Sequence, residues 1–378
     1  MRTRICDMFG IEFPIFAFTH CRDVVAAVSK AGGLGVLGAL AFSGEQLEIE
    51  LAWIDEHVDG KPYGVDVVMP SSSVGREAGI DAGKLADMIP EEHRKFVDGL
   101  MERFELPPLP EDEPKPQGLL GWTQEGASSQ ADIALAHPIT LLVSALGTPP
   151  KEIVDKVHAK GAMMAALVGS AHQAEKQIAA GTDIIVASGY EAGGHTGEIT
   201  SMVLIPDVVD AVSPAPVLAA GGIGSGRQMA AAMALGAEGV WTGSIWLTVK
   251  ESNTGPMMME KLMKATSQDT LRSRSLSGKP ARQLRTAWID AWEAPDSPGA
   301  LPMPLQYMLT AEAQRRIGRY VQMADGDPKN LSGTPVGQIV GRMNNIPSSR
   351  DLILGMVEEF IETSNRVSGL LETSQVEA

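Results

Sequence analysis

The sequence predicts an α/β protein built on a TIM (β/α)8 barrel, with a lid-like insertion in the barrel and a C-terminal helical appendage. Between residues 14 and 242, short apolar runs rich in β-branched residues alternate with stretches of helical periodicity, which implies parallel strands joined by right-handed crossovers. Eight such runs occur, the number of strands that closes a (β/α)8 barrel. The main alternative is an open doubly wound sheet, which favours a glycine fingerprint after the first strand. Residues 17–22 (AFTHCR), where that strand ends, contain no glycine.

Each expected element follows from its local pattern. Strands of a parallel sheet are buried on both faces, so a short and almost continuous apolar run predicts a strand. These runs are 14–18, 34–39, 63–69, 139–145, 162–168, 183–188, 216–220 and 238–242. Between most of them, apolar residues recur at helical spacing. The expected helices are 22–31, 44–56, 150–160, 171–180, 205–212 and 225–235.

An insertion over residues 71–138 interrupts this alternation between the third and fourth strands. It contains a helical pattern at 91–104 and the Pro- and acid-rich piece LPPLPEDEPKPQG at 106–118. Compact folds rarely contain connections this long unless they are lids or binding loops. We therefore expect residues 1–70 and 139–250 to form the barrel and residues 71–138 to act as its lid.

Residues 251–378 do not continue the barrel pattern and are expected to form a helical appendage closing the substrate side. Helices are expected at 257–264, 282–292, 310–323 and 350–365. The last dozen residues are expected to be frayed, as chain ends usually are.

Composition indicates an enzyme and argues against several other classes of protein. The chain has 378 residues, 44% of them hydrophobic, and 40 glycines, as is typical of a large α/β enzyme. Its net charge of -16 and pI of about 4.9 disfavour nucleic acid and anionic membranes as partners. No run of 18 apolar residues predicts a membrane span, and the N-terminus lacks the apolar core of a secretion signal. With only Cys6 and Cys21 available for a disulfide, we expect a cytoplasmic protein.

Glycines gather where the seventh and eighth expected strands end. Gly221 and Gly222 end one strand, Gly224-Ser225 opens the next helix, and Gly243-Ser244 ends the following strand. Main-chain amides without a Cβ beside them can bind a phosphate, and TIM barrels frequently hold one after strands seven and eight. Tight turns and helix packing would explain the glycines singly, but their pairing at this place favours a phosphate site.

His195 lies in the loop after the sixth expected strand, in the sequence SGYEAGGHTG (188–197). Its ordinary pKa near ~6.5 would let it exchange a proton at neutral pH, so we expect it to be catalytic. Glu191 either orients His195 or caps the loop, and spacing does not separate the two roles. A metal site is not expected, because the seven histidines show no HxH or HExxH spacing and two cysteines are too few for a zinc set.

Other polar and aromatic residues have two interpretations each. Cys21, beside His20, is either a nucleophile or, more commonly, a small buried residue. Arg282 and Arg285 either bind an anionic group or lie solvated on a helix. A set of Trp and Met residues either lines an apolar pocket or packs a core: Trp241, Trp246, Met257, Met258, Met259, Met303 and Met308.

The run from 183 to 252, which includes DIIVASGYEAGGHTG and PVLAAGGIGSGRQMAAAMALGAEGVWTGS, resembles the nitronate monooxygenase family, formerly called 2-nitropropane dioxygenases. It is nearly as similar to the related FMN-dependent enoyl-acyl-carrier-protein reductases. The N-terminal FGIEFPIFAF and the piece SGKPAR (277–282) support the resemblance more weakly, so about half of the chain is covered.

The resemblance implies a TIM barrel that binds FMN. Gly222 and 241–244 (Trp241, Thr242, Gly243, Ser244) match phosphate contacts of the family, and Gly193 matches the glycine of its EAGGH motif. Ser188 stands where the family often has glutamine, and Asp66 where asparagine is common. The first-strand loop Ala17, Phe18, Thr19 replaces a longer flavin contact. Neighbouring loop glycines complete the expected cofactor set: Gly189, Gly194 and Gly221.

Two activities, and one role without turnover, follow from this resemblance. A nitronate monooxygenase would oxidise nitronates or nitroalkanes with O2 to carbonyl plus nitrite, with His195 as base or nitronate-binding group. An NAD(P)H-dependent reductase would use the same FMN to reduce an enoyl thioester or quinone. A flavin-binding protein without turnover would make His195 incidental. The partners expected are therefore a small-molecule substrate and O2 or NAD(P)H, and a homo-oligomer stays open.

Overall fold

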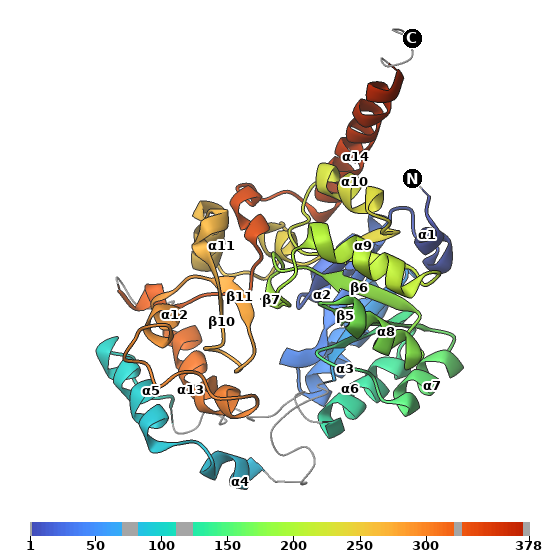
Figure 1. The fold of residues 1–378 in the computed structure, drawn as a ribbon. Coiled ribbons are helices and arrows are strands. Elements are labelled where there is room, and N and C mark those ends of the chain that lie inside the picture. The colour runs from blue at the N-terminus through green and yellow to red at the C-terminus, as the bar shows by residue number, and fades with distance from the viewer. Residues whose placement is uncertain (1, 70–81, 111–123, 321–326, 373–378) are drawn as a thin grey trace.

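The computed structural model describes residues 2–69, 82–110, 124–320 and 327–372. A closed barrel of parallel strands surrounded by helices lies on one side, and a smaller lobe of helices with a short antiparallel sheet lies on the other (Figure 1). The chain therefore has the predicted TIM-barrel architecture.

The barrel contains eight strands, and all eight predicted strands are confirmed to within two residues at either end. The strands follow the chain around the barrel, and the last pairs with the first through Phe16↔Trp241. They are β1 (Ile15–Thr19), β2 (Leu34–Gly38), β3 (Tyr63–Val68), β4 (Leu141–Ala145), β5 (Met163–Val168), β6 (Ile184–Ser188), β8 (Val217–Ala220) and β9 (Gly239–Thr242).

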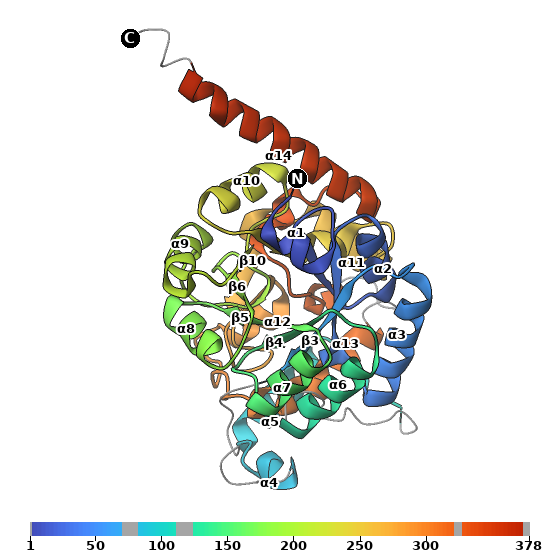
Figure 2. The same ribbon diagram turned by 90° about the vertical axis from the view of Figure 1, so that its right-hand side faces the viewer.

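Helices cover the outside of the barrel (Figure 2). They are α2 (Arg22–Lys30), α3 (Gly44–His57), α6 (Gln124–Ala136), α7 (Lys151–Ala159), α8 (Ala171–Ala179), α9 (Ser201–Val212) and α10 (Gly226–Ala234), with short 3-10 turns at Ala39–Ala41 and Ser244–Thr248. The prediction that α9 begins at residue 205 is wrong. The helix begins at Ser201, because Glu191 from the connection between β6 and α9 binds the Ser201 amide and so stabilises an earlier first turn.

Alternate residues of each strand point into the barrel and out toward the helices, as the pleat requires. Phe16, Val36 and Trp241 pack with other inward-pointing residues, while Val65 and Val67 pack against the outer helices. An additional helix, α1 (Arg4–Phe9), adds Ile5 and Phe9 to the inner core, and the Phe9 and Phe16 rings meet edge to face at 5.4 Å. Nothing in the sequence pattern predicted α1.

The lobe combines the insertion with part of the C-terminal region. It contains α4 (Ala82–Asp87), α5 (Glu91–Arg103), α12 (Ala287–Trp292) and α13 (Leu305–Tyr320), and α11 (Pro256–Lys264) lies near its boundary with the barrel (Figure 1). Val97, Leu100 and Met101 of α5 share one apolar cluster with Trp288 and Ile317, among others. Short 3-10 turns occupy Ser267–Asp269, Asp327–Leu331 and Gln338–Arg342.

A three-stranded sheet joins the lobe to the barrel and was not predicted. Its order is β10 (Thr270–Ser273), β11 (Ala281–Leu284) and β7 (Gly194–His195), all antiparallel. The prediction of a helix over 282–292 is therefore wrong in its first part. Thr286 accepts a hydrogen bond from the Ile289 amide and starts α12 there, after the chain has paired as β11.

The last helix, α14 (Ser349–Glu372), packs its first half on α10 and α2 and then extends away from the body (Figures 1 and 2). The helix predicted over 310–323 begins earlier, at Leu305, and the predicted residues 321–323 lie outside the described chain. The expectation of a frayed end is wrong for residues 367–372, which continue α14; residues 373–378 also lie outside the described chain. Among the described helices, none is long and apolar enough to cross a membrane.

Candidate active site

Three glycine-rich segments meet at the carboxyl ends of β6, β8 and β9. Gly221 and Gly222 adopt left-handed conformations, with φ of 100° and 70°, which favour glycine. A Cβ on Gly221 would lie 3.1 Å from the Gly189 amide nitrogen, and a Cβ on Gly222 would lie 3.3 Å from the Cβ of Glu191. The loops after β6 and β8 are therefore in direct contact.

A distant segment, Val336 and Gly337, completes this contact and was missed from the sequence. The Gly337 amide donates a hydrogen bond to Ser244 Oγ at 2.8 Å. A Cβ on Gly193 would lie 2.7 Å from that same amide nitrogen and 2.8 Å from Val336. Gly193, expected as a cofactor contact, is thus required at least for this close approach of two backbones. In the sequence, only the two glycines of residues 332–338 (SGTPVGQ) could have indicated that this segment approaches another backbone closely.

Main-chain amides at this place are available to bind an anion. Among the described residues, no hydrogen-bond acceptor is found for the amides of Gly222, Gly243 and Ser244. A Cβ on Gly243 would have no atom nearer than 3.8 Å, so its missing side chain leaves open space. Such amides form the kind of cradle that binds phosphate.

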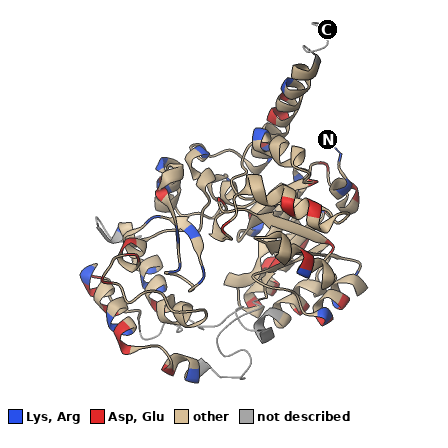
Figure 3. Cartoon of the chain, in the orientation of Figure 1, with Lys and Arg blue, Asp and Glu red and all other residues tan. Residues whose placement is uncertain are grey.

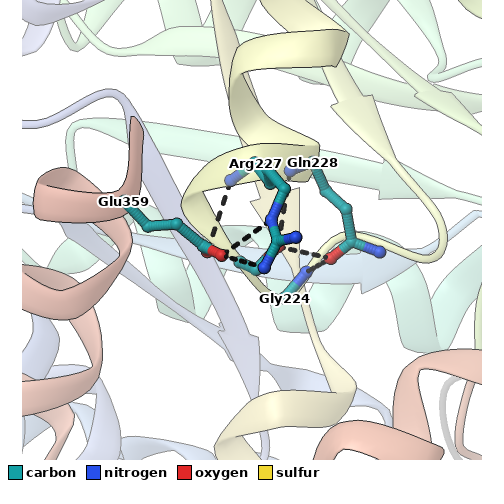
Figure 4. Close-up of polar contacts among 5 residues, drawn as sticks. Gly224, Arg227, Gln228 and Glu359 are labelled. Carbon is teal, nitrogen blue, oxygen red and sulfur yellow. Dashed lines mark hydrogen bonds and ion pairs between the residues drawn. The ribbon is translucent and has the colours of Figure 1, made fainter. Parts of the chain in front are cut away.

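Gln228 holds the loop that contains these amides (Figure 4). Its Oε1 accepts from the Gly224 amide at 3.0 Å. Its Nε2 donates to the Gly222 carbonyl. Glu359 of α14 binds the neighbouring Arg227 at 2.8 Å and also accepts from its amide. The first turn of α10 is therefore fixed on one side by its own glutamine and on the other by the C-terminal helix.

His195 is partly buried where β7 pairs with β11, opposite Ala281. Its Nε2 lies 2.7 Å from Ser277 Oγ, and that oxygen also accepts from the Lys279 amide at 3.4 Å and lies 3.5 Å from the Lys279 carbonyl oxygen. Burial, and secondarily the charge of Lys279, lower the pKa of His195 to about 4. The expectation of a pKa near 6.5 is corrected, and the ring is neutral at pH 7.

Glu191 caps a helix and does not orient His195. Its carboxylate accepts hydrogen bonds from the amide of Ser201 at 3.0 Å and from the Ser201 hydroxyl at 2.9 Å. A carboxylate at the N-terminus of α9 is favoured by the helix dipole. Of the two roles left open by spacing, the structure thus supports the cap.

Four of the expected cofactor contacts point into the barrel near its carboxyl end. Phe18 and Trp241 stack with their ring centroids 6.1 Å apart, and Ser188 is buried on β6. Asp66 is buried, and among the described residues nothing forms a hydrogen bond or ion pair with its carboxyl group. Burial raises the pKa of Asp66 to about 7.

Other expected contacts present their side chains elsewhere. Ala17 packs between the strands and the outer helices, because it follows the inward-pointing Phe16 by one residue. Thr242 Oγ1 donates to the Phe16 carbonyl and accepts from Trp246 Nε1, both at 3.0 Å. Thr19 Oγ1 accepts from the Cys21 amide at 3.1 Å. Only the main chain of Ala17 and Thr242 is left for a ligand.

Gly189 and Gly194 are required by two different constraints. A Cβ on Gly189 would lie 2.1 Å from Ser201 Oγ, so this glycine allows α9 to approach β6. Gly194 has a φ of 73° with no atom within 4 Å of its Cβ position, so backbone conformation alone favours glycine there.

The structure also decides between the two interpretations given above for the arginines, for Cys21 and for the Trp and Met residues. Arg285 is exposed and pairs with Asp290 at 2.7 Å, whereas Arg282 is buried and its Nε donates to the Tyr190 carbonyl at 3.1 Å. Cys21 is a buried thiol that donates to the Glu251 carbonyl. Six of the seven Trp and Met residues, all but Met259, are spread over five separate apolar clusters, so core packing explains those six. In the described ranges, no group of three His, Cys, Asp or Glu side chains could hold a metal.

A closed (β/α)8 barrel with an amide cradle and a partly buried histidine at the carboxyl ends of its strands defines a TIM-barrel enzyme. The sequence model of a family described as "Nitronate monooxygenase" matches residues 2–359. The chain belongs to the nitronate monooxygenase family and is an oxidoreductase.

Individual relatives agree with this membership. Rv1533 of Mycobacterium tuberculosis, provisionally named a monooxygenase, is 53% identical over 374 residues, which are 98% of this chain and all of that protein. A protein of Staphylococcus aureus (strain Newman), provisionally named a nitronate monooxygenase, is 30% identical over 91% of this chain and 97% of its own length. The structure of FabK from Thermotoga maritima has a TM-score of 0.71 and 27% identity, covering 98% of this chain and 99% of that one.

Proposed function

We propose that the chain is an FMN-dependent nitronate monooxygenase, which oxidises nitronates or nitroalkanes with O2 to carbonyl plus nitrite. The observation that carries the proposal is one end of a barrel where amides without acceptors, at Gly222, Gly243 and Ser244, adjoin the loop that contains His195. The cradle suits the FMN phosphate, and inward-pointing Asp66 and Ser188 offer polar groups to the ring. FMN supplies the redox chemistry that side chains lack.

Within this proposal His195 binds the nitronate and is not a strong base. A general base works best with a pKa near the operating pH, and a pKa of about 4 is well below neutrality. A neutral imidazole still carries one N–H group, which can donate a hydrogen bond to a nitronate oxygen.

An anaerobic experiment tests the activity. Purified protein loaded with FMN is mixed without oxygen either with propyl-2-nitronate or with NAD(P)H, and flavin absorbance is followed. Reduction by the nitronate is expected. Reduction by NAD(P)H alone would replace the proposal by the second candidate, an NAD(P)H-dependent reductase of an enoyl thioester or quinone, which the likeness to FabK favours.

Cofactor binding has its own test at Gly243. Gly243 has φ -122°, outside the left-handed region, and a Cβ there would have no atom nearer than 3.8 Å, so Gly243→Ala should fold without a steric clash. The added methyl would stand in the cradle and weaken FMN binding by at least about tenfold, the loss of one hydrogen bond to a charged group. If a fluorescence titration shows unchanged affinity for FMN, the phosphate does not bind at Gly243.

A cytoplasmic location belongs to the same proposal. Cys6 and Cys21 are free, buried thiols, as is common in a reducing compartment.

A further inference from the structure

The loop between β10 and β11 runs directly beside His195. Ser277 Oγ lies 2.7 Å from His195 Nε2, and the Thr196 amide donates to the Pro280 carbonyl at 3.3 Å. The β7–β11 ladder then pairs His195 with Ala281. Lys279 lies between these contacts and therefore belongs to the surroundings of His195, although no role was expected for it.

Basic residues outnumber acidic ones along this hairpin (Figure 3). Arg272 pairs with Glu198 at 3.1 Å, and Arg282 is buried against the Tyr190 ring and carbonyl. Two other carboxylates that contact the segments around this hairpin are engaged elsewhere: Glu191 caps α9, and Glu293 accepts from Ser273. Lys279 is half-buried, and within the described chain its ammonium forms no ion pair or side-chain hydrogen bond.

A half-buried ammonium without a counter-ion loses part of its hydration free energy, and no ion pair compensates for that loss. An anion bound between Lys279 and Ser277 would restore both charge balance and hydrogen bonding. His195 is neutral and offers no charge of its own, whereas the charge of Lys279 acts on it.

We propose that Lys279 determines substrate charge, by binding the anionic head of a nitronate beside His195 and so favouring nitronates over neutral nitroalkanes. This inference rests on the proposed function and adds the charge preference and the residue responsible for it. The Ser277 hydroxyl would donate a hydrogen bond to the same head group. The Lys279 ammonium would act as a point charge, for which a guanidinium is a partial substitute.

The kinetic test compares two forms of one carbon skeleton. KM is measured for propyl-2-nitronate and for 2-nitropropane with Lys279→Met, Lys279→Arg and a control, Lys264→Met, which removes an exposed lysine paired only with Glu260. Lys279→Met should raise KM about 10- to 100-fold for the nitronate, the usual loss for a hydrogen bond to a charged group, and less than about threefold for the nitroalkane. Lys279→Arg should recover most of the nitronate affinity. Equal changes for both substrates, or none, would overturn the inference.

A binding test without turnover separates this inference from the proposed function. Sodium nitrate, a planar anion with the shape of the nitronate head, is titrated into flavin-free protein while His195 is followed by NMR. The wild type should bind nitrate more tightly than Lys279→Met, and that variant should raise the pKa of His195, because a neighbouring positive charge is lost. If the enzyme oxidises neither substrate, the proposed function fails, and nitrate binding alone decides the role of Lys279. Equal nitrate affinities would refute that role.

Discussion

Asp66 provides a test of the barrel interior that is independent of catalysis. Its pKa is raised from 3.8 to about 7 by burial, so the folded protein holds a proton that the unfolded chain has released at neutral pH. The contribution of Asp66 to stability is therefore highest below about pH 4 and is lost as the pH rises through 7. At 1.36 kcal/mol per pH unit, the difference corresponds to about 4 kcal/mol above pH 8, as an upper value. Asp66→Asn removes this penalty because the amide has nearly the same shape and does not ionise.

The free energy of unfolding of flavin-free Asp66→Asn and wild type is compared by urea denaturation at pH 5 and pH 8.5. The variant should gain about 2–4 kcal/mol relative to the wild type at the higher pH and much less at the lower. Asp155→Asn, an exposed carboxylate paired with Lys151, is the control and should show no such dependence. A pH-independent difference, or a variant less stable at pH 8.5, would refute the assignment of Asp66 as a buried carboxyl without a partner.

Three further predictions concern the loops and the C-terminal helix. Gly226→Ala places a Cβ 2.1 Å from the Met356 carbonyl oxygen and should lower the free energy of unfolding by at least about 1–3 kcal/mol. Gly355→Ala, whose Cβ would have nothing within 4 Å, should leave stability unchanged or raise it. Thermal unfolding measures both. Glu191→Gln keeps the shape of the α9 cap without its charge and should cost about 0.3–1 kcal/mol in the same assay, because the helix dipole favours a carboxylate at this end. His195→Asn should retain FMN and lower kcat/KM for propyl-2-nitronate about 10- to 100-fold, the loss of one hydrogen bond to a charged group, measured as nitrite release; full activity would remove His195 from the mechanism.

The barrel could be predicted because its strands are buried on both faces. Such strands appear in the sequence as apolar runs, and helices between them show their own period. The small sheet could not be predicted: β7 has two residues and β10 and β11 have four each, too few to display a period. The same tertiary pairing converted the start of 282–292 from the expected helix into a strand.

The site was predictable in part. Loops at the carboxyl ends of strands contain the glycines and His195, as the TIM-barrel rule requires. Strand alternation from Phe16 would have directed Ala17 outward, although family resemblance had suggested a contact. Ser277, Lys279 and Gly337 come from segments far along the chain, and their approach to His195 and Ser244 is a property of the folded state only.

Because α5 shares its apolar cluster with α12 and α13, the lobe is a joint product of two stretches that are distant in sequence. Deleting either stretch would remove the packing partners of the other and expose its leucine and tryptophan side chains to solvent, next to an otherwise intact barrel. A truncated enzyme that lacks the lobe must therefore lack both stretches. For the same reason, adding the lobe to a TIM barrel that lacks it requires inserting two separate segments into that chain.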